Sequence, residues 1–232
     1  MSTIDMGATE WIEAALEPEI TLGGPAGRVH SGGAGVDGTA DVFVLQRRVS
    51  IGMPQVRRLS AEDPALTDED RRFVASSTAA YFLVKFAASL AGGEGERLAE
   101  ARFGVELADP GLAWSLAPLR LAGDRGDSGF SVNGEVNLIA GLKIGGSWAP
   151  PADREVCWVY ALGEQEPDPE WRLQSVPNHV IDGPHQFAMV AQVRCGVPAS
   201  GSVRLTARFE RSGFTFRCRA KLPRAAEEFT LA

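Results

Sequence analysis

Residues 202–222, SVRLTARFERSGFTFRCRAKL, contain two short segments in which apolar and polar side chains alternate. Apolar residues take odd positions in the first segment and even positions in the second: Val203, Leu205, Ala207 and Phe209, then Phe214, Phe216, Cys218 and Ala220. Alternation with a period of two is typical of a β-strand that buries one face. The stretch therefore predicts an antiparallel hairpin, with Cys218 as a packed core thiol.

The register of this hairpin follows from the requirement that both apolar sets share one face. Directly opposed residues must then have numbers that add up to an odd value. A four-residue loop over residues 210–213 satisfies this condition by pairing Phe209 with Phe214. We expect this pairing.

The opposite face of the predicted hairpin is basic. Its cationic residues are Arg204, Arg208, Arg217, Arg219 and Lys221. The expected register places Arg204 opposite Arg219 and Thr206 opposite Arg217, and opposed like charges are mildly destabilising. The face therefore predicts an anionic partner, which could be an acidic protein surface, this chain's own N-terminal third, or a phosphate-bearing ligand. The alternative, which is favoured, is a solvated face on which Arg stems cover the sheet.

Further strand signals precede the hairpin, separated by Pro, Gly and acidic residues. They are CWVYAL at 157–162, WRLQSV at 171–176 and QFAMVAQV at 186–193. This spacing is typical of a sandwich or a small barrel. We predict an α+β, mainly β protein with an antiparallel, β-sandwich-like C-terminal part and a helix-containing N-terminal part.

The expected organisation has four parts. They are an acidic, Gly-rich segment with a short helix and one strand (1–65), a helix with antiparallel strands (66–149), a sandwich-like domain (150–224) and a tail (225–232).

Two stretches resemble helices. The first is short and lies around Trp11 to Leu16. The second is FVASSTAAYFLVKFAASLAG, residues 73–92, which follows a capping pattern at Thr67 and precedes Gly92-Gly93. Its length would suit a membrane span, but Lys85 lies near its middle. A buried helix of a soluble protein is favoured over membrane insertion.

Residues 130–144 alternate almost without a break, with apolar residues at even positions from Phe130 to Ile144. The pattern predicts either one long half-buried strand or a hairpin that turns at Asn133-Gly134. Together with the apolar stretch 73–92, this Gly-, Ser- and Asn-rich segment is the kind of element that pore-forming proteins insert.

Composition excludes several classes of protein. The chain has 232 residues, a formal charge of −7 and 23% charged residues, which excludes collagen-like, disordered and coiled-coil proteins. Its acidic balance argues against nucleic acid as a partner. Residues 1–70 hold 5 basic and 12 acidic residues and so account for the whole excess. Only three of the cationic residues are Lys, which is typical of a GC-rich bacterial gene.

The expected compartment is the cytoplasm. The N-terminus, MSTIDMGATEWIEAALEPEI, lacks the basic and then apolar order of a secretory signal. The three cysteines, Cys157, Cys195 and Cys218, share no CxxC spacing, and we interpret them as free thiols in a reducing environment.

Gly126-Asp127-Ser128-Gly129 resembles the nucleophile signature of trypsin-like serine proteases. The resemblance implies Ser128 as nucleophile and a catalytic histidine within Ser77–Tyr81, where Tyr81 takes the place of the histidine. No histidine lies between Tyr81 and Ser128, and the interval is too short for two barrels. A chance match in a Gly- and Ala-rich chain is therefore favoured over an active protease of this type.

A second candidate site is the spacing His179-x-x-Asp182-x-x-His185. Two imidazoles and a carboxylate form a sensible zinc or iron ligand set. Gly183-Pro184 prevents the helix that would align them, so turn residues without a metal are favoured. No phosphate-binding or dinucleotide-binding loop is present, and we expect no cofactor.

The function expected from the sequence is that of a non-enzymatic interaction or assembly protein, which presents β-sheet faces to a protein partner or to copies of itself. Whether it is an enzyme stays open, although no complete catalytic set supports one. The first alternative is a membrane-active or pore-forming protein, with a membrane possible but not favoured as partner. The second is a hydrolase or metalloenzyme.

Overall fold

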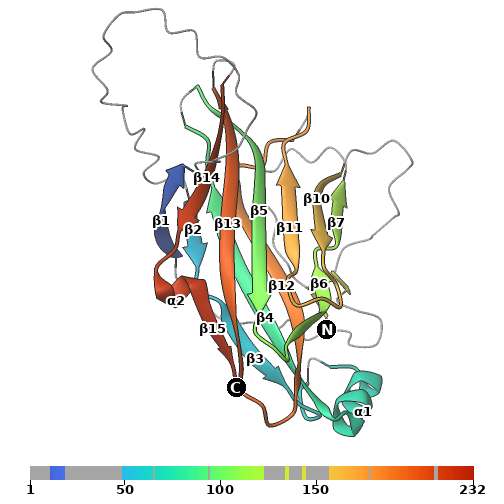
Figure 1. The fold of residues 1–232 in the computed structure, drawn as a ribbon. Coiled ribbons are helices and arrows are strands. Elements are labelled where there is room, and N and C mark those ends of the chain that lie inside the picture. Colours follow the sequence, from blue (N-terminus) through green and yellow to red (C-terminus); the bar gives the residue numbers. More distant parts are fainter. Residues whose placement is uncertain are drawn as a thin grey trace, which may run out of the picture.

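Antiparallel strands make up most of the described chain. The computed structural model describes residues 11–18, 49–64, 66–93, 95–122, 134–135, 143–144, 157–177, 179–211 and 214–232. Thirteen strands form one sheet, in the order β6-β12-β4-β2-β1-β14-β13-β5-β11-β10-β7, with β3 beside β4 and β15 beside β13 (Figure 1). The prediction of a mainly β, antiparallel protein is confirmed.

The strands of the first half precede β8. They are β1 (Trp11–Pro18), β2 (Val49–Gly52), β3 (Gln55–Leu59), β4 (Ala79–Leu90), β5 (Arg97–Leu107), β6 (Leu112–Ala117) and β7 (Arg120–Ala122). The later strands are β8 (Gly134–Glu135), β9 (Lys143–Ile144), β10 (Cys157–Leu162), β11 (Glu170–Gln174), β12 (Gly183–Arg194), β13 (Ala199–Arg211), β14 (Phe214–Lys221) and β15 (Glu228–Leu231). The helices are α1 (Asp68–Ser76) and α2 (Arg224–Glu227). Strands from both sides of residue 150 are interspersed in this one sheet.

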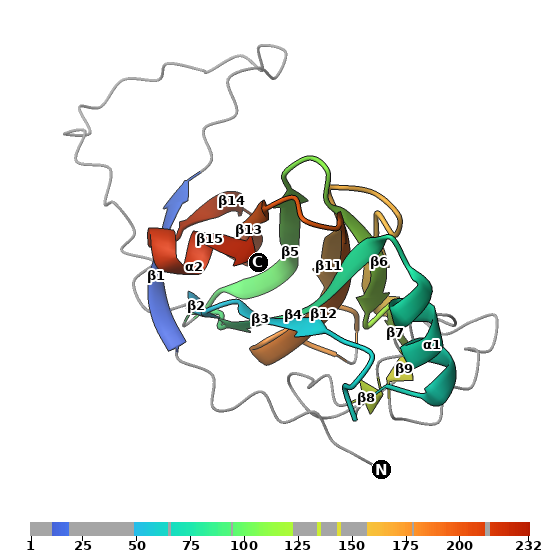
Figure 2. The same ribbon diagram turned by 90° about the horizontal axis from the view of Figure 1, so that it is seen from below.

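Strand β1 joins the two halves of the sheet. Its residues 11–14 pair with β2, and its residues 15–18 pair with β14. Because the sheet bends back on itself, it is nearly closed and barrel-like, as the view along the strands shows (Figure 2). We predicted a sandwich-like arrangement for the C-terminal part, and the observed shape is not clearly a sandwich.

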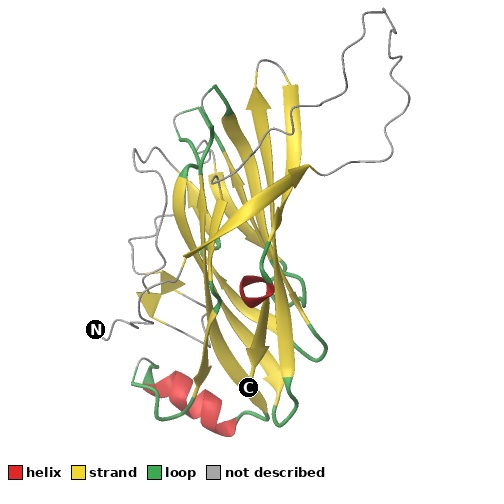
Figure 3. Cartoon of the chain, turned by 90° about the vertical axis from the view of Figure 1, so that its left-hand side faces the viewer, coloured by secondary structure: helices red, strands yellow, loops and turns green. Residues whose placement is uncertain are grey.

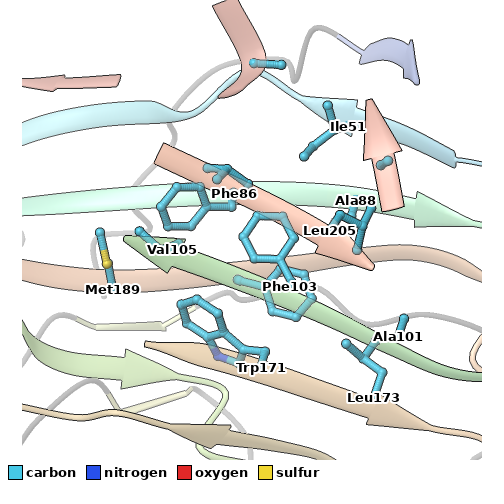
Figure 4. Close-up of a cluster of buried hydrophobic side chains, with 14 of the residues drawn as sticks. Ile51, Phe86, Ala88, Ala101, Phe103, Val105, Trp171, Leu173, Met189 and Leu205 are labelled. Carbon is cyan, nitrogen blue, oxygen red and sulfur yellow. The ribbon is translucent and has the colours of Figure 1, made fainter. Parts of the chain in front are cut away.

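Aromatic side chains from both halves fill the interior. Phe103 of β5 stacks on Phe187 of β12 with ring centroids 4.7 Å apart, and Phe86 of β4 lies 5.4 Å from Phe103 (Figure 4). Trp171 of β11 lies 5.2 Å from Phe187 and donates its indole N–H to the carbonyl of Pro118 at 3.1 Å. This hydrogen bond fixes the β6–β7 link to the core.

The stretch 73–92 is not one buried helix, so that prediction is wrong. Helix α1 ends at Ser76, and strand β4 occupies residues 79–90. Both faces of β4 are covered, because Phe86 points into the main core while Leu83 belongs to a second apolar cluster with Phe73 of α1. A strand buried on both faces has the continuous apolar sequence that we interpreted as a helix.

The cap expected at Thr67 is confirmed. Its hydroxyl accepts a hydrogen bond from the backbone N–H of Asp70 at 3.1 Å. Helix α1 then lies against one end of the molecule (Figure 3). None of the helices in the described ranges is long and apolar enough to cross a bilayer.

The short helix expected around Trp11 to Leu16 is strand β1, which is a second correction. Its apolar residues Ala14 and Leu16 are buried, whereas Glu13 and Glu17 are exposed. The segment therefore has the period of a strand, although its Ala, Glu and Leu content favours a helix.

The C-terminal hairpin has the predicted faces but a different register. Arg208 lies opposite Arg217, and Thr206 lies opposite Arg219, so the pairing differs by two residues from the expected one. Phe209 pairs with Phe216 and not with Phe214. Of the predicted buried face, six residues are shown to be buried: Val203, Leu205, Ala207, Phe209, Cys218, which is 1% exposed, and Ala220. Burial raises the pKa of the Cys218 thiol.

Candidate functional site

Strands β7 and β10 form one end of the main sheet. Strand β10 pairs with β11 on one side and with β7 on the other, and β7 is the last strand of the order. Tyr160 pairs with Arg120 and Cys157 with Ala122. The chain that connects these two strands therefore leaves the sheet and returns to it at an edge.

A second pair of strands lies within this connection. Strands β8 and β9 form a separate two-stranded sheet, in which Gly134 pairs with Ile144 and Glu135 with Lys143. They lie apart from the main sheet, on the side of α1 (Figures 2 and 3). The segment 130–144 is otherwise outside the described residues.

The two strand pairs have almost the same register. Paired residue numbers add up to 280 for Arg120 and Tyr160, to 279 for Ala122 and Cys157, and to 278 for Gly134 and Ile144. The two pairs therefore have nearly the same centre in the sequence, although they belong to separate sheets. The pairing also shows that Gly134 is inside a strand, so the expected turn at Asn133-Gly134 is wrong.

Hydrogen bonds and core packing hold the base of this hairpin. The Cys157 thiol donates to the carbonyl of Leu121 at 3.1 Å, and Gln174 Nε2 donates to the Cys157 carbonyl at 2.6 Å. The backbone N–H of Ala161 donates to the Leu119 carbonyl at 2.9 Å. Trp171 holds the neighbouring Pro118, so the base is continuous with the core.

The basic face of β13 and β14 has acidic neighbours of its own. Arg204 lies 3.9 Å from Glu106, and Arg208 lies 3.5 Å from Glu100; both carboxylates belong to β5. Lys221 contacts Glu17 of β1 at 3.1 Å. Within the described part of the acidic N-terminal third, Glu17 is thus a carboxylate that meets this face. Exposed ion pairs of this kind contribute between about 0 and 1 kcal/mol each.

The three side chains of the His179 spacing make different contacts. His185 is fully buried, and its Nε2 donates to the carbonyl of Ile181 at 2.9 Å. Asp182 accepts a hydrogen bond from the backbone N–H of Gly92 at 3.1 Å, and the His179 ring lies 3.8 Å from the Trp158 ring. Among the described residues, no three His, Cys, Asp or Glu side chains gather as a metal site.

Burial lowers the pKa of His185 to about 4. Its hydrogen bond to the Ile181 carbonyl and the charge of Asp182 oppose this shift, whereas nearby His179 adds to it. The imidazole is therefore neutral at neutral pH, and it functions as a buried packing and hydrogen-bonding group. The protease-like motif at Ser128 lies outside the described residues.

Known proteins resemble the chain in structure but not in sequence. No family model and no curated protein matches it. A structure titled "Pore forming protein" aligns over 78% of this chain and 90% of its own, with 8% identity and a TM-score of 0.32. The delta-toxin of Clostridium perfringens aligns over 80% of this chain and 92% of its own, with 6% identity and a TM-score of 0.33. The NetB toxin of the same organism, solved in its membrane-inserted form, aligns over 95% of this chain and 94% of its own, with 10% identity and a TM-score of 0.34.

These neighbours correct two expectations. They are titled as a pore-forming protein and as toxins, which contradicts the expectation of a structural or assembly protein. A neighbour solved in a membrane-inserted form likewise contradicts the expected cytoplasmic location. It also gives no support to the expectation that a membrane is not a favoured partner. At TM-scores of 0.32 to 0.34 the likeness carries no functional argument by itself. The chain's own hairpin must supply that argument.

Proposed function

We propose that this protein is a membrane-active, pore-forming protein that inserts the hairpin between β7 and β10 into a lipid bilayer. The observation that carries the proposal is the register of β8 and β9, in which Gly134 pairs with Ile144 and Glu135 with Lys143. Even-numbered residues thus lie opposite even-numbered residues, and odd opposite odd. Because the apolar residues of both arms are even-numbered, the register gives them one common face.

Continued along the sequence, this register produces an amphipathic hairpin. It would pair Val136 with Leu142, and Phe130 with Trp148 at the base. Apart from Ile139 at the centre, the odd-numbered residues of the opposite face are polar or small: Ser131, Asn133, Glu135, Asn137, Gly141, Lys143, Gly145 and Ser147. Strands that cross a bilayer alternate in this way, with apolar residues toward lipid and aromatic residues near the interface.

The length of the arms also suits a bilayer. Residues 130–138 and 140–148 provide nine residues on each side of Ile139. A tilted strand needs about 9–11 residues to cross the hydrocarbon core. Pro150-Pro151 then ends the second arm, so the apolar alternation stops where a membrane-spanning strand would leave the lipid.

Insertion requires self-association. A single hairpin has two edges with unpaired backbone groups, and each such group costs several kcal/mol in lipid. The hairpins of several copies must therefore pair edge to edge around a water-filled centre. The proposal accordingly keeps copies of the same chain as partners and adds the membrane.

The test uses an environment-sensitive dye at two adjacent positions of the hairpin. In a background with Cys157→Ser, Cys195→Ser and Cys218→Ala, one variant carries Val132→Cys and its matched control carries Asn133→Cys. With phosphatidylcholine–cholesterol vesicles, we expect the dye at position 132 to shift to the blue and the dye at position 133 to remain water-exposed. The same vesicles should release a trapped dye.

A hairpin-replacement variant supplies the second control. Residues 130–148 are replaced by a short Gly-Ser linker, and circular dichroism checks that the β-rich body is retained. We expect this variant to release no trapped dye. Equal dye signals at positions 132 and 133, together with intact vesicles for the wild type at neutral and acidic pH, would overturn the proposed function.

A further inference from the structure

A row of side chains crosses neighbouring strands on the outside of the sheet. The strands are β7, β10, β11, β5, β13 and β14, which lie side by side (Figure 1). Each residue of the row is the direct Cα partner of the next, in the order Arg120, Tyr160, Arg172, Arg102, Thr206 and Arg219. Directly opposed residues share one face of a sheet. Because Trp171, Phe103 and Cys218, which are sequence neighbours of the row, are buried in the core, the row faces outward.

The outer face of these strands carries an excess of positive charge. Among the described side chains of β5, β11, β13 and β14, it carries eight Arg or Lys residues and four Glu residues. This excess contrasts with the formal charge of −7 for the whole chain. Arg172 and Arg102 are directly opposed, and opposed like charges are destabilising unless opposite charge lies beside them. The face therefore favours an anionic partner.

Hydrogen bonds position the two guanidinium groups at the centre of the row. Arg102 donates from Nε to a carboxylate oxygen of Glu100 at 2.6 Å, and Arg172 donates from Nε to Glu170. Arg172 also hydrogen-bonds to the Tyr160 hydroxyl. A side chain that is already held in one geometry loses less conformational freedom when it binds an anion.

Three further arginines extend this surface. Arg204 lies across its Cα partner Gly104, with its Nε 3.0 Å from the point where a Cβ of Gly104 would lie. The glycine of β5 thus leaves room for the Arg204 side chain against the sheet. Arg120 and Arg219, at the two ends of the row, are exposed, and neither forms an ion pair with a carboxylate among the described residues.

The dimensions and the chemistry of the row fit a linear sulfated polysaccharide. Neighbouring strands lie about 4.8 Å apart, so the row from Arg120 to Arg219 is roughly 24 Å long. A sugar unit of an extended polysaccharide has about the length of one strand spacing, so such a chain places its anionic groups along the row. Arg binds oxyanions through parallel N–H donors. The hydroxyls of Tyr160 and Thr206 can hydrogen-bond to the sugar hydroxyls.

Two other anionic partners fit this face less well. Single-stranded nucleic acid binds where aromatic side chains stack on successive bases, and Tyr160 is the one aromatic residue of the row. The carboxylates of Glu100 and Glu170 repel a continuous line or plane of phosphate groups. A sugar chain, in contrast, can donate hydrogen bonds to these carboxylates between its sulfate groups.

We propose that the outer face of β7, β10, β11, β5, β13 and β14 binds a linear sulfated polysaccharide, which lies across the strands from Arg120 to Arg219. This inference goes beyond the proposed function and does not depend on it, because the residues of the row belong to the folded body.

The experiment measures the binding of fluorescently labelled heparin oligosaccharides to the full chain by anisotropy, at about 0.15 M ionic strength. The wild type should bind a hexasaccharide, which can span the row, at least about tenfold more tightly than a disaccharide. Arg120→Gln with Arg219→Gln removes the cations at both ends of the row. This double variant should bind the hexasaccharide about tenfold more weakly than the wild type.

The matched control is Arg58→Gln with Arg72→Gln, which removes two exposed cations from β3 and α1 instead. Its affinity for the hexasaccharide should stay within about twofold of the wild type, because charges beyond the Debye length are screened. Urea unfolding checks that both double variants are folded as stably as the wild type.

The outcomes decide the proposal and separate it from the pore. An equal loss of affinity in the row variant and in the control would overturn it, because net charge alone would then explain the binding. Affinity that does not rise with oligosaccharide length, absence of binding, or tighter binding to single-stranded DNA or to phosphatidylglycerol vesicles would also overturn it. Dye release from phosphatidylcholine–cholesterol vesicles, which carry no glycan, tests the pore separately, so either proposal can fail alone.

Discussion

We predict that acid destabilises the folded body through protonation of His185. This imidazole is fully buried in β12, with Ala88 of β4 as its Cα partner, and it donates through Nε2 to the Ile181 carbonyl. Desolvation lowers its pKa from 6.5 to about 4. Two titratable side chains act on the pKa of His185: His179 lowers it further, and Asp182 raises it.

The sign and the size of the effect follow from proton linkage. Below about pH 6.5 the unfolded chain binds a proton at this position that the folded chain does not bind, so acid favours unfolding. The contribution of the neutral His185 is complete above the unfolded pKa and is lost as the pH falls toward the folded pKa. The whole difference between 6.5 and about 4 corresponds to roughly 3 kcal/mol, of which about 2 kcal/mol is lost by about pH 5.

The assay compares urea unfolding at about pH 7.5 and about pH 5 for the wild type, His185→Gln and His185→Phe. Gln retains a donor for the Ile181 carbonyl, and Phe retains a ring of similar size. One variant therefore keeps the hydrogen bond, the other keeps the packing, and neither can take up a proton. Both should lose about 2 kcal/mol less than the wild type between the two pH values. Carboxylates titrate equally in all three proteins and cancel. An identical loss in all three would refute the assignment of the buried neutral imidazole.

Three shorter predictions test the core and the basic face. Phe103→Ala removes a ring that contacts Phe86, Phe187 and Trp171, and it should lower the free energy of unfolding by about 3–5 kcal/mol in urea; a loss below about 1 kcal/mol would contradict the packing described. Trp171→Phe leaves the Pro118 carbonyl without its donor and should cost about 1–3 kcal/mol by the same measurement. If the basic face binds anionic surfaces, the double variant Arg204→Glu with Arg219→Glu should bind phosphatidylglycerol vesicles more weakly in flotation; unchanged binding would leave a solvated face.

Sequence periodicity predicted the faces of the C-terminal hairpin but not its register. The odd and even apolar sets require only that paired numbers add up to an odd value. A four-residue loop with Phe209 opposite Phe214 and a two-residue loop with Arg211 opposite Phe214 both satisfy this condition. Parity therefore determined which residues are buried, while loop length was left undetermined.

The errors at 73–92 and at Trp11–Leu16 have different physical causes. Strand β4 is covered on both faces, and a continuous apolar run does not distinguish such a strand from a buried helix. Strand β1 has a helix-favouring composition, but pairing with β2 and β14 overrides it. The alternation of Ala14 and Leu16 with Glu13 and Glu17 was the available signal for a strand.

The candidate site was present in the sequence as one pattern with two interpretations. Apolar residues at even positions from Phe130 to Ile144 fit one long strand, and they equally fit two arms whose paired numbers add up to an even value. Only the pairing of β8 with β9 selects the second interpretation. The partnership of β7 with β10 could not be predicted, because it joins residues more than thirty positions apart and depends on packing around Trp171.

Under the proposed function, the place of β7 and β10 at the end of the sheet would let the segment between them insert while the body remains folded. Strand β7 ends the strand order, and β10 is held from its other side by β11. Extending the two arms beyond Ala122 and Cys157 adds pairs to the hairpin and breaks none in the β10–β11 or β11–β5 ladders. The base stays attached through Trp171 and Pro118. Core substitutions should therefore change the free energy of unfolding and have little effect on membrane insertion. Substitutions within residues 130–148 should change membrane insertion and have little effect on the free energy of unfolding.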